Sequence, residues 1–170
     1  ASRKATFENV HLENITLEST ISGTGAQNTA LMSAAEGAII KNCTANNVKI
    51  NVANKTSKTY IGGFSAWGSS DIENSYINNL VIEETNNTNI GGIGGLVGLL
   101  NNESYNIKNS YVIGKICSNS GNIGGLIGYG GSCTITNSYA YVDIIGNGDY
   151  IGGIIGRDTA STSKINNNLY

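Results

Sequence analysis

The sequence of 170 residues contains no proline, a single histidine and few charged side chains, which make up 13 % of the chain. Its 10 basic and 12 acidic residues leave a formal net charge of −2. Nucleic-acid-binding proteins normally carry a basic excess or a basic stripe, so this balance argues against such a surface. The longest apolar stretch, residues 90–100, is rich in glycine, and a transmembrane helix needs roughly 20 predominantly apolar residues. We therefore expect no nucleic-acid partner and no membrane insertion.

The scarcity of histidine and cysteine argues against several kinds of catalytic centre. A zinc protease site of the His-Glu-x-x-His type needs two histidines on one helix face, and this chain has only His11. We expect His11 to point outward from the first coil rather than to form a nucleophile pair with Ser or Cys. No Cys-x-x-Cys motif occurs among Cys43, Cys117 and Cys133. Three small buried thiols are the favoured interpretation, and a disulfide between Cys117 and Cys133 is the alternative.

The abundant residues are glycine, asparagine and isoleucine, with 23 Gly, 25 Asn and 23 Ile against only 9 Leu. Isoleucine favours strands, because β-branched side chains suit a pleated surface. Glycine and asparagine favour frequent turns. A hydrophobic content of 39 % is too high for a disordered chain of low complexity. The composition predicts an ordered, turn-rich, all-β protein.

Two motifs alternate along the whole chain. The first is an apolar residue, any residue, Asn and a small residue, often followed by Tyr, and successive copies lie about 33, 32, 35, 28 and 30 residues apart. It occurs at residues 7–10, 40–43, 72–76, 107–111 and 135–139, with a degenerate copy at 165–168. The second motif, based on Ile-Gly-Gly and further apolar residues, occurs at residues 61–66, 93–98, 123–128 and 151–156, with residues 29–33 in the matching place of the first repeat. Two motifs in constant order indicate a repeat protein.

The repeats predict strands rather than helices. They lack the 3.6-residue apolar period, and paired glycines would break a helix at its centre. Parallel stacking pairs each strand with its equivalent in the next repeat and satisfies the backbone hydrogen-bonding groups. Proline, which would remove a hydrogen bond from such a ladder, is absent. We therefore predict an all-β, right-handed parallel β-solenoid (β-helix) of about five to six coils with repeats of about 30 residues, its hand following from the crossover rule for parallel strands.

In-register stacking would align equivalent side chains in columns. The asparagines of the first motif would form a ladder of side-chain amides: Asn9, Asn42, Asn74, Asn109, Asn137 and Asn167. The residues before them begin with alternating charges, so that opposite signs would be neighbours: Glu8, Lys41, Glu73 and Lys108. The tyrosines after them predict an aromatic ladder on the outside, for which a structural role is favoured over ligand binding: Tyr76, Tyr111 and Tyr139. The paired glycines are expected to permit close packing at a narrow corner.

The phrases Ile-Gly-Gly-Leu-Val-Gly and Ile-Lys-Asn-Ser-Tyr-Val resemble GLUG repeats, which take their name from a Gly-Leu-(apolar)-Gly signature. The signature stands complete at residues 95–98 and 125–128, and in altered form at residues 63–66 and 153–156. Similar repeats occur in large bacterial surface proteins, including the amino-terminal region of the immunoglobulin A protease family of zinc metallopeptidases. The resemblance implies that residues 1–170 form a single GLUG-like β-solenoid domain. It further implies that this domain is a piece of a larger secreted or wall-attached bacterial protein, with a metalloprotease as one candidate parent.

Acidic residues are the remaining candidates for chemistry. Glycan-cleaving enzymes need a pair of carboxylates spaced for acid and base catalysis. Four acids fall in the turn between the Gly-Gly strand and the next Asn motif and are expected to line one edge: Glu36, Asp71, Glu103 and Asp158. Turns are also where solvated carboxylates normally lie, so we assign no catalytic, cofactor-binding or metal-binding residue and expect no cofactor.

The sequence thus predicts a non-catalytic module: a stalk, an adhesin or a substrate-positioning segment. Its expected partners are a host protein or glycan and the flanking domains of its own chain. Two longer loops, residues 51–60 and 83–92, are the first choice for specific recognition. The alternative is a glycan-binding or glycan-cleaving β-helix that uses the edge carboxylates.

Overall fold

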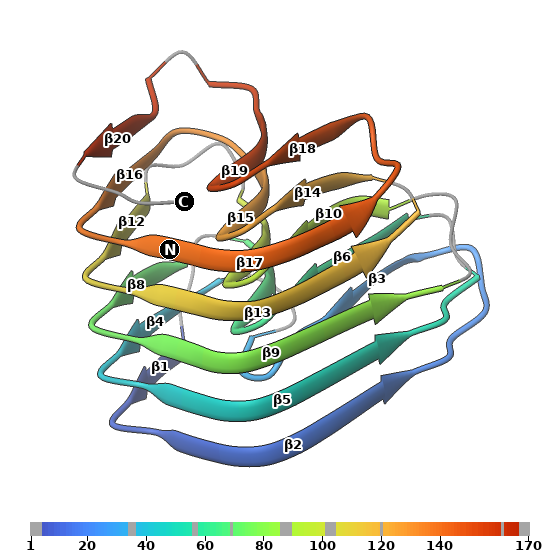
Figure 1. The fold of residues 1–170 in the computed structure, drawn as a ribbon, viewed down its shortest axis with the longest axis horizontal. Coiled ribbons are helices and arrows are strands. Elements are labelled where there is room, and N and C mark those ends of the chain that lie inside the picture. The colour runs from blue at the N-terminus through green and yellow to red at the C-terminus, as the bar shows by residue number, and fades with distance from the viewer. Residues whose placement is uncertain are drawn as a thin grey trace.

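We describe the fold in a computed structural model of the chain, shown in Figure 1. The structure describes residues 5–33, 37–55, 58–68, 70–85, 90–100, 105–119, 121–160 and 162–166. These residues form strands and turns, which confirms the predicted all-β class. Within those ranges no helix is long and apolar enough to cross a membrane.

Four parallel sheets run along the stack, and the chain visits them in the same order in each coil (Figure 1). The first sheet consists of β1 (Ala5–Glu8), β4 (Ala38–Lys41), β8 (Asp71–Glu73), β12 (Tyr105–Lys108), β16 (Cys133–Thr136) and β20 (Lys164–Asn166). The second consists of β2 (His11–Ser19), β5 (Thr44–Val52), β9 (Tyr76–Glu84), β13 (Tyr111–Ser118) and β17 (Tyr139–Gly146). The third consists of β3 (Ala26–Thr29), β6 (Lys58–Gly62), β10 (Ile90–Gly94), β14 (Asn122–Gly124) and β18 (Tyr150–Gly152). The fourth consists of β7 (Ser65–Trp67), β11 (Val97–Leu99), β15 (Ile127–Gly130) and β19 (Ile155–Asp158).

The stack is a right-handed β-solenoid of about five coils, as predicted. In Figure 1 the strands of the second sheet face the viewer and run from left to right, while successive coils rise from β2 to β17. That combination of direction and rise defines a right-handed path, the hand expected for crossovers between parallel strands. The first and last coils therefore lie at opposite ends of the stack.

The register of the first sheet follows the Asn motif. Its strands pair through the apolar residue that opens each copy of the motif: Phe7 with Ile40, Ile40 with Ile72, Ile72 with Ile107, Ile107 with Ile135, and Ile135 with Ile165. The residues that follow these also pair, which places the predicted alternating charges in one column. Within that column, Lys108 Nζ lies 3.9 Å from Glu73 Oε1. The predicted register is confirmed.

The asparagine of each motif makes the turn between the first and second sheets. All five described copies have a left-handed backbone, with φ from 49° at Asn109 to 56° at Asn9. Asparagine tolerates this conformation better than most residues, because its short polar side chain can hydrogen-bond locally. The side-chain amide of Asn74 donates to Asn42 Oδ1 at 3.3 Å, and that of Asn137 donates to Asn109 Oδ1 at 3.3 Å. The predicted ladder is confirmed from Asn42 to Asn137; Asn167 lies outside the described residues.

The serines that follow three of these asparagines, Ser75, Ser110 and Ser138, form a second ladder, which the sequence did not predict. Ser110 is buried, accepts a hydrogen bond from the backbone N–H of Ser75 at 3.1 Å, and donates one to the carbonyl of Lys108 at 2.8 Å. Ser138 makes the equivalent bonds to Ser110 and Thr136. These hydroxyls satisfy backbone groups at a turn where the strand ladder is interrupted.

The Gly-Gly motif lets the third and fourth sheets lie against each other. A Cβ placed on Gly94 would lie 2.0 Å from the carbonyl oxygen of Val97 in the same coil. A Cβ on the following Gly95 would lie 2.2 Å from the carbonyl oxygen of Gly125 in the next coil. Equivalent contacts of 1.8–1.9 Å occur at Gly62, Gly124 and Gly152. The glycines are therefore required for close packing at a corner, as predicted.

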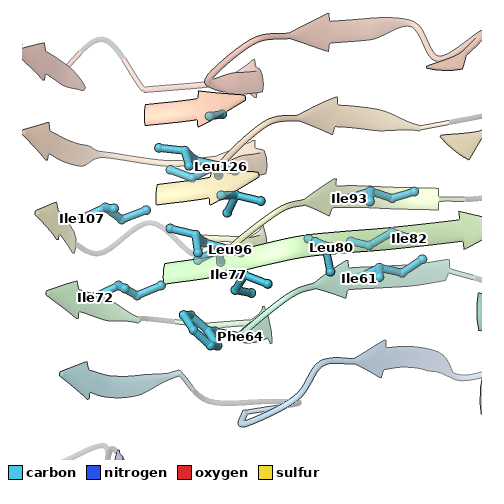
Figure 2. Packing of buried hydrophobic residues seen from close by; sticks show 14 of the residues in the cluster. Ile61, Phe64, Ile72, Ile77, Leu80, Ile82, Ile93, Leu96, Ile107 and Leu126 are labelled. Atoms are coloured by element: carbon cyan, nitrogen blue, oxygen red, sulfur yellow. The ribbon is translucent and has the colours of Figure 1, made fainter. Parts of the chain in front are cut away.

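The core consists of apolar columns enclosed by the four sheets (Figure 2). Phe64, Leu96 and Leu126 lie above one another, and each is fully buried. Apolar residues of the last coil are less buried than their equivalents in the coil before it. Ile123 is fully buried, whereas Ile151, its partner in β18, is 47 % exposed. Each apolar side chain is thus shielded largely by its equivalents in the neighbouring coils.

The cysteines occupy unrelated positions and are all free. Cys43 and Cys133 are buried, in agreement with the favoured interpretation, whereas Cys117 is partly exposed. Cys117 belongs to β13 in the second sheet and Cys133 to β16 in the first. The alternative of a disulfide between Cys117 and Cys133 is therefore wrong.

Candidate binding surface

The second sheet has the longest strands of the stack. Its strands are eight or nine residues long, against three to five in the other sheets. Alternate residues of these strands point outward, and pairing arranges them in columns. One column contains His11, Thr44, Tyr76, Tyr111 and Tyr139. The next contains Glu13, Asn46, Asn78, Ile113 and Tyr141.

The three stacked tyrosines form the predicted ladder. Ring centroids of Tyr76 and Tyr111, and of Tyr111 and Tyr139, lie 4.7 Å apart with nearly parallel planes. Burial raises the pKa of Tyr111, and the hydrogen bond of its side chain with Asn78 offsets part of this shift. Because the rings cover one another's faces, the ladder presents ring edges and hydroxyl groups to solvent. This geometry supports a structural role for the ladder itself.

A second asparagine ladder bends the lower strands of this face. Asn14, Asn47 and Asn79 have φ values of 53–55°, and each successive amide donates to the one before it at 2.9 Å. The ladder ends at β9, because Asn78 and Asn79 both lie opposite Ile113 in the shorter β13. Such a two-against-one arrangement is a β-bulge, which bends the strand that carries it.

A depression of about 500 Å³ lies where this second ladder ends. It is lined by Asn79, Ile113, Gly114, Ala140, Tyr141, Val142, Asp143 and Gly153. Tyr141 is 77 % exposed, and the Asp143 carboxylate lies one outward position further along β17. The depression therefore lies at the edge of β17, the last strand of the second sheet, because its lining includes both outward residues (Tyr141, Asp143) and residues of the core side (Ala140, Val142).

Two of the four predicted edge carboxylates, Asp71 and Asp158, belong to the described residues. Asp71 begins β8 in the first sheet, where its Oδ1 accepts hydrogen bonds from the backbone and side-chain N–H groups of Asn106 at 3.1 and 3.4 Å. Asp158 ends β19 in the fourth sheet and accepts a hydrogen bond from the backbone N–H of Ala160. Register places Asp71 beside Asn106 and Asp158 beside Gly130, so the two carboxylates do not share a column, although both lie next to the turn between the fourth and first sheets. Glu36 and Glu103 lie outside the described residues.

One acidic residue is buried instead. Glu84 ends β9, is only 3 % exposed, and accepts a hydrogen bond from Ser118 Oγ at 2.9 Å. Its carboxylate therefore lies inside the corner that follows the second sheet, where a macromolecular ligand cannot reach it.

His11 points outward from the first coil, as predicted, with 61 % of its side chain exposed. It forms a hydrogen bond with the Thr44 hydroxyl, and its Nε2 lies 3.1 Å from Oε2 of Glu13. Within the described part of the chain no cluster of three His, Cys, Asp or Glu side chains is arranged to hold a metal ion.

Comparisons of the chain with known protein families, with curated proteins and with solved structures find no match. The functional argument therefore depends on the geometry of the chain's own surfaces.

The sequence predicted that specific recognition involves the two longer loops, residues 51–60 and 83–92, rather than this depression. Residues 56–57 and 86–89 of the two longer loops lie outside the described residues, and much of the remainder belongs to strands β5, β6, β9 and β10. No described residue of either loop lines the depression. Its one sequence signal is an asparagine five positions after the motif asparagine, present in the first three repeats and replaced in the fourth.

Proposed function

We propose that this chain is a non-catalytic binding module of a secreted or wall-attached bacterial protein. The observation that carries the proposal is the depression at the end of the Asn79 ladder, where β9 and β13 pair on both sides of the bulge and β13 pairs with β17 along its length. Concave sites with an apolar lining and a few directed polar groups are typical of ligand recognition. A stack of paired strands keeps such a site preformed, so binding requires little ordering of the chain.

The positions of the carboxylates support binding rather than catalysis. A glycoside hydrolase needs two carboxyl groups on either side of one bond, roughly 5–9.5 Å apart. Asp71 and Asp158 lie in different sheets. Asp71 accepts hydrogen bonds from the backbone and side-chain N–H groups of Asn106 in the next coil, whereas Asp158 accepts one from the backbone N–H of Ala160, two residues along the chain. These hydrogen bonds give both carboxylates a structural role without a substrate.

The resemblance to GLUG repeats supports the proposed location of the protein, secreted or attached to the cell wall. The third and fourth repeats carry the complete Gly-Leu-(apolar)-Gly signature at residues 95–98 and 125–128, and such repeats occur in large bacterial surface proteins. In that setting the rigid stack holds neighbouring domains apart while its second sheet contacts a host protein or glycan. A metallopeptidase is one candidate for the parent protein, in which case this module would position the substrate.

Parallel assays of binding and turnover test the proposal. The purified chain is titrated by biolayer interferometry against immobilised fibronectin, collagen and laminin, and against a panel of polysaccharides. The same polysaccharides are incubated with the chain and assayed for new reducing ends and unsaturated products. Saturable binding to at least one surface without product is the expected result. Product release that is abolished by Asp71→Asn would instead establish the glycan-cleaving alternative, and failure to bind any of the surfaces would contradict the proposal.

A further inference from the structure

We infer that Asn147 is a site of spontaneous modification, at which the side-chain amide is lost and aspartate and isoaspartate are formed. In this reaction the backbone nitrogen of the following residue attacks the side-chain carbonyl carbon of an asparagine. The reaction is favoured where that nitrogen has no hydrogen bond and where the following residue is glycine, which has no side chain to obstruct the attack. Asn147 and Gly148 form the one Asn-Gly pair of the sequence. Neither residue lines the depression, and the modification is independent of the proposed binding function.

The pair lies in the turn between β17 and β18, at the corner that joins the second and third sheets (Figure 1). Asn147 is exposed, and among the described residues neither its side chain nor the backbone N–H of Gly148 has a hydrogen-bond partner. Strand pairing in register on both sides of the turn makes Asn119 the equivalent residue of the preceding coil. Asn119 is exposed as well, although another coil lies above it. The exposure of Asn147 is therefore a property of the corner and not of the last coil.

Hydrogen bonds protect the asparagines of the first-motif ladder from the same reaction. The backbone N–H that follows Asn42 donates to Ser75 Oγ at 3.0 Å. The one that follows Asn74 donates to Ser110 Oγ at 3.1 Å, and an equivalent bond follows Asn109. The side-chain amides of Asn74 and Asn109 also donate to the asparagine of the preceding coil. Both the attacking nitrogen and the amide would have to leave these hydrogen bonds first, which lowers the rate of the reaction.

The reaction consumes one water and releases one ammonia. The backbone nitrogen of Gly148 forms a bond to Cγ of Asn147 and loses its proton, while the C–N bond of the side-chain amide breaks and ammonia leaves. Water then opens the resulting five-membered imide. Attack at the side-chain carbonyl gives aspartate, and attack at the backbone carbonyl gives isoaspartate, whose main chain is longer by one carbon atom. Each product carries one more negative charge than asparagine at neutral pH, beside Asp149.

Ageing of the purified full chain tests this inference. The chain is incubated at pH 8, and samples taken over several weeks are digested and analysed by tandem mass spectrometry. Isoaspartate is detected separately through its methylation by protein isoaspartate methyltransferase and S-adenosylmethionine. We expect residue 147 to convert at least about tenfold faster than Asn74 or Asn109, because one hydrogen bond of about 1.4 kcal/mol that must break first accounts for a factor of ten. A peptide of residues 144–151 is the positive control for the reaction conditions.

Two variants assign the isoaspartate signal. Asn147→Gln should abolish it, because glutamine would have to close a larger and less favourable ring. Asn119→Gln is the matched control, at the equivalent position of the preceding coil, and should leave the signal unchanged. Circular dichroism verifies that both variants fold; if Asn147→Gln does not, mapping of the modified residue in the unaltered chain decides alone. Conversion of the peptide but not of the chain, faster conversion at a ladder asparagine, or a signal that survives in Asn147→Gln would overturn the inference.

Discussion

The side-chain amide of Asn109 donates a hydrogen bond to Oδ1 of Asn74 at 3.0 Å, across 35 residues of sequence. The same residue has a left-handed backbone with φ of 49°. One asparagine therefore provides both the turn between two sheets and a link between two coils.

Replacing Asn109 should separate these two roles. Asn109→Gly keeps the left-handed turn but removes the amide, so we expect a loss of about 1 kcal/mol in the free energy of unfolding. Asn109→Ala removes the amide and also places a Cβ in an unfavourable backbone conformation, which raises the expected loss to about 2–3 kcal/mol. Urea unfolding followed by circular dichroism measures both values. Equal losses in the two variants would show that the backbone conformation contributes nothing.

The paired glycines should tolerate no side chain at the corner. A Cβ on Gly94 would lie 2.0 Å from a backbone oxygen, whereas one on Gly23 would contact nothing within 4 Å. We expect Gly94→Ala to cost about 3 kcal/mol or to prevent folding, because backbone atoms of two sheets would have to move. Gly23→Ala is the control and should change stability by less than about 0.5 kcal/mol. Thermal unfolding measures the difference, and near-equal midpoints would contradict the packing argument.

Identical substitutions in one core column should have different costs along the stack. Ile135 is fully buried between coils, while its partner Ile165 in β20 is 50 % exposed. Ile135→Ala should destabilise the protein by about 2–4 kcal/mol through lost burial and a residual cavity. Ile165→Ala should cost less than about 1 kcal/mol, since much of its surface is already hydrated. The midpoints of denaturant unfolding compare the two variants. A larger loss of stability from Ile165→Ala would contradict the position of β20 at the end of the first sheet.

The three thiols should react at different rates. Burial raises the pKa of Cys133, which lowers its thiolate fraction at a given pH. Its buried neutral form therefore contributes stability that is fully present below the pKa of the unfolded thiol and is lost as pH rises through the higher folded pKa. At pH 8 we expect a thiol-reactive dye to label the partly exposed Cys117 first and the buried Cys43 and Cys133 slowly. Cys117→Ser should remove the fast phase of labelling. A fast phase that remains in this variant would refute the assignment of that phase to Cys117.

The fold was predictable because the residues that set the strand register recur in every repeat of the sequence. Phe7, Ile40 and Ile72 open the Asn motif in three successive repeats, and the structure pairs these same residues. Because each repeat contacts only its neighbours, the pairing of equivalent residues can be predicted from the repeat alone. The buried serine ladder escaped prediction, because a small residue after Asn has many possible roles until its hydroxyl geometry is known.

The candidate site was less predictable because it arises where the repeat is broken. Asn79 has equivalents in the first two coils, but β13 contains one residue fewer at this point. The sequence shows that an asparagine is replaced; it does not show that a bulge ends there or that a depression follows. Asp71 and Asp158 show the same limit, since they have similar positions in the repeat but belong to different sheets on either side of one turn.

Parallel stacking also determines how the module would respond to force. Tension applied between the first and last coils is directed along the hydrogen bonds that join neighbouring coils, so these bonds would break in sequence rather than together. Each coil that peels away would release about 30 residues, or about 100 Å of extended chain. The module would then lengthen in steps, and the depression, which is lined by the terminal strand β17, would be among the first parts of the stack to open.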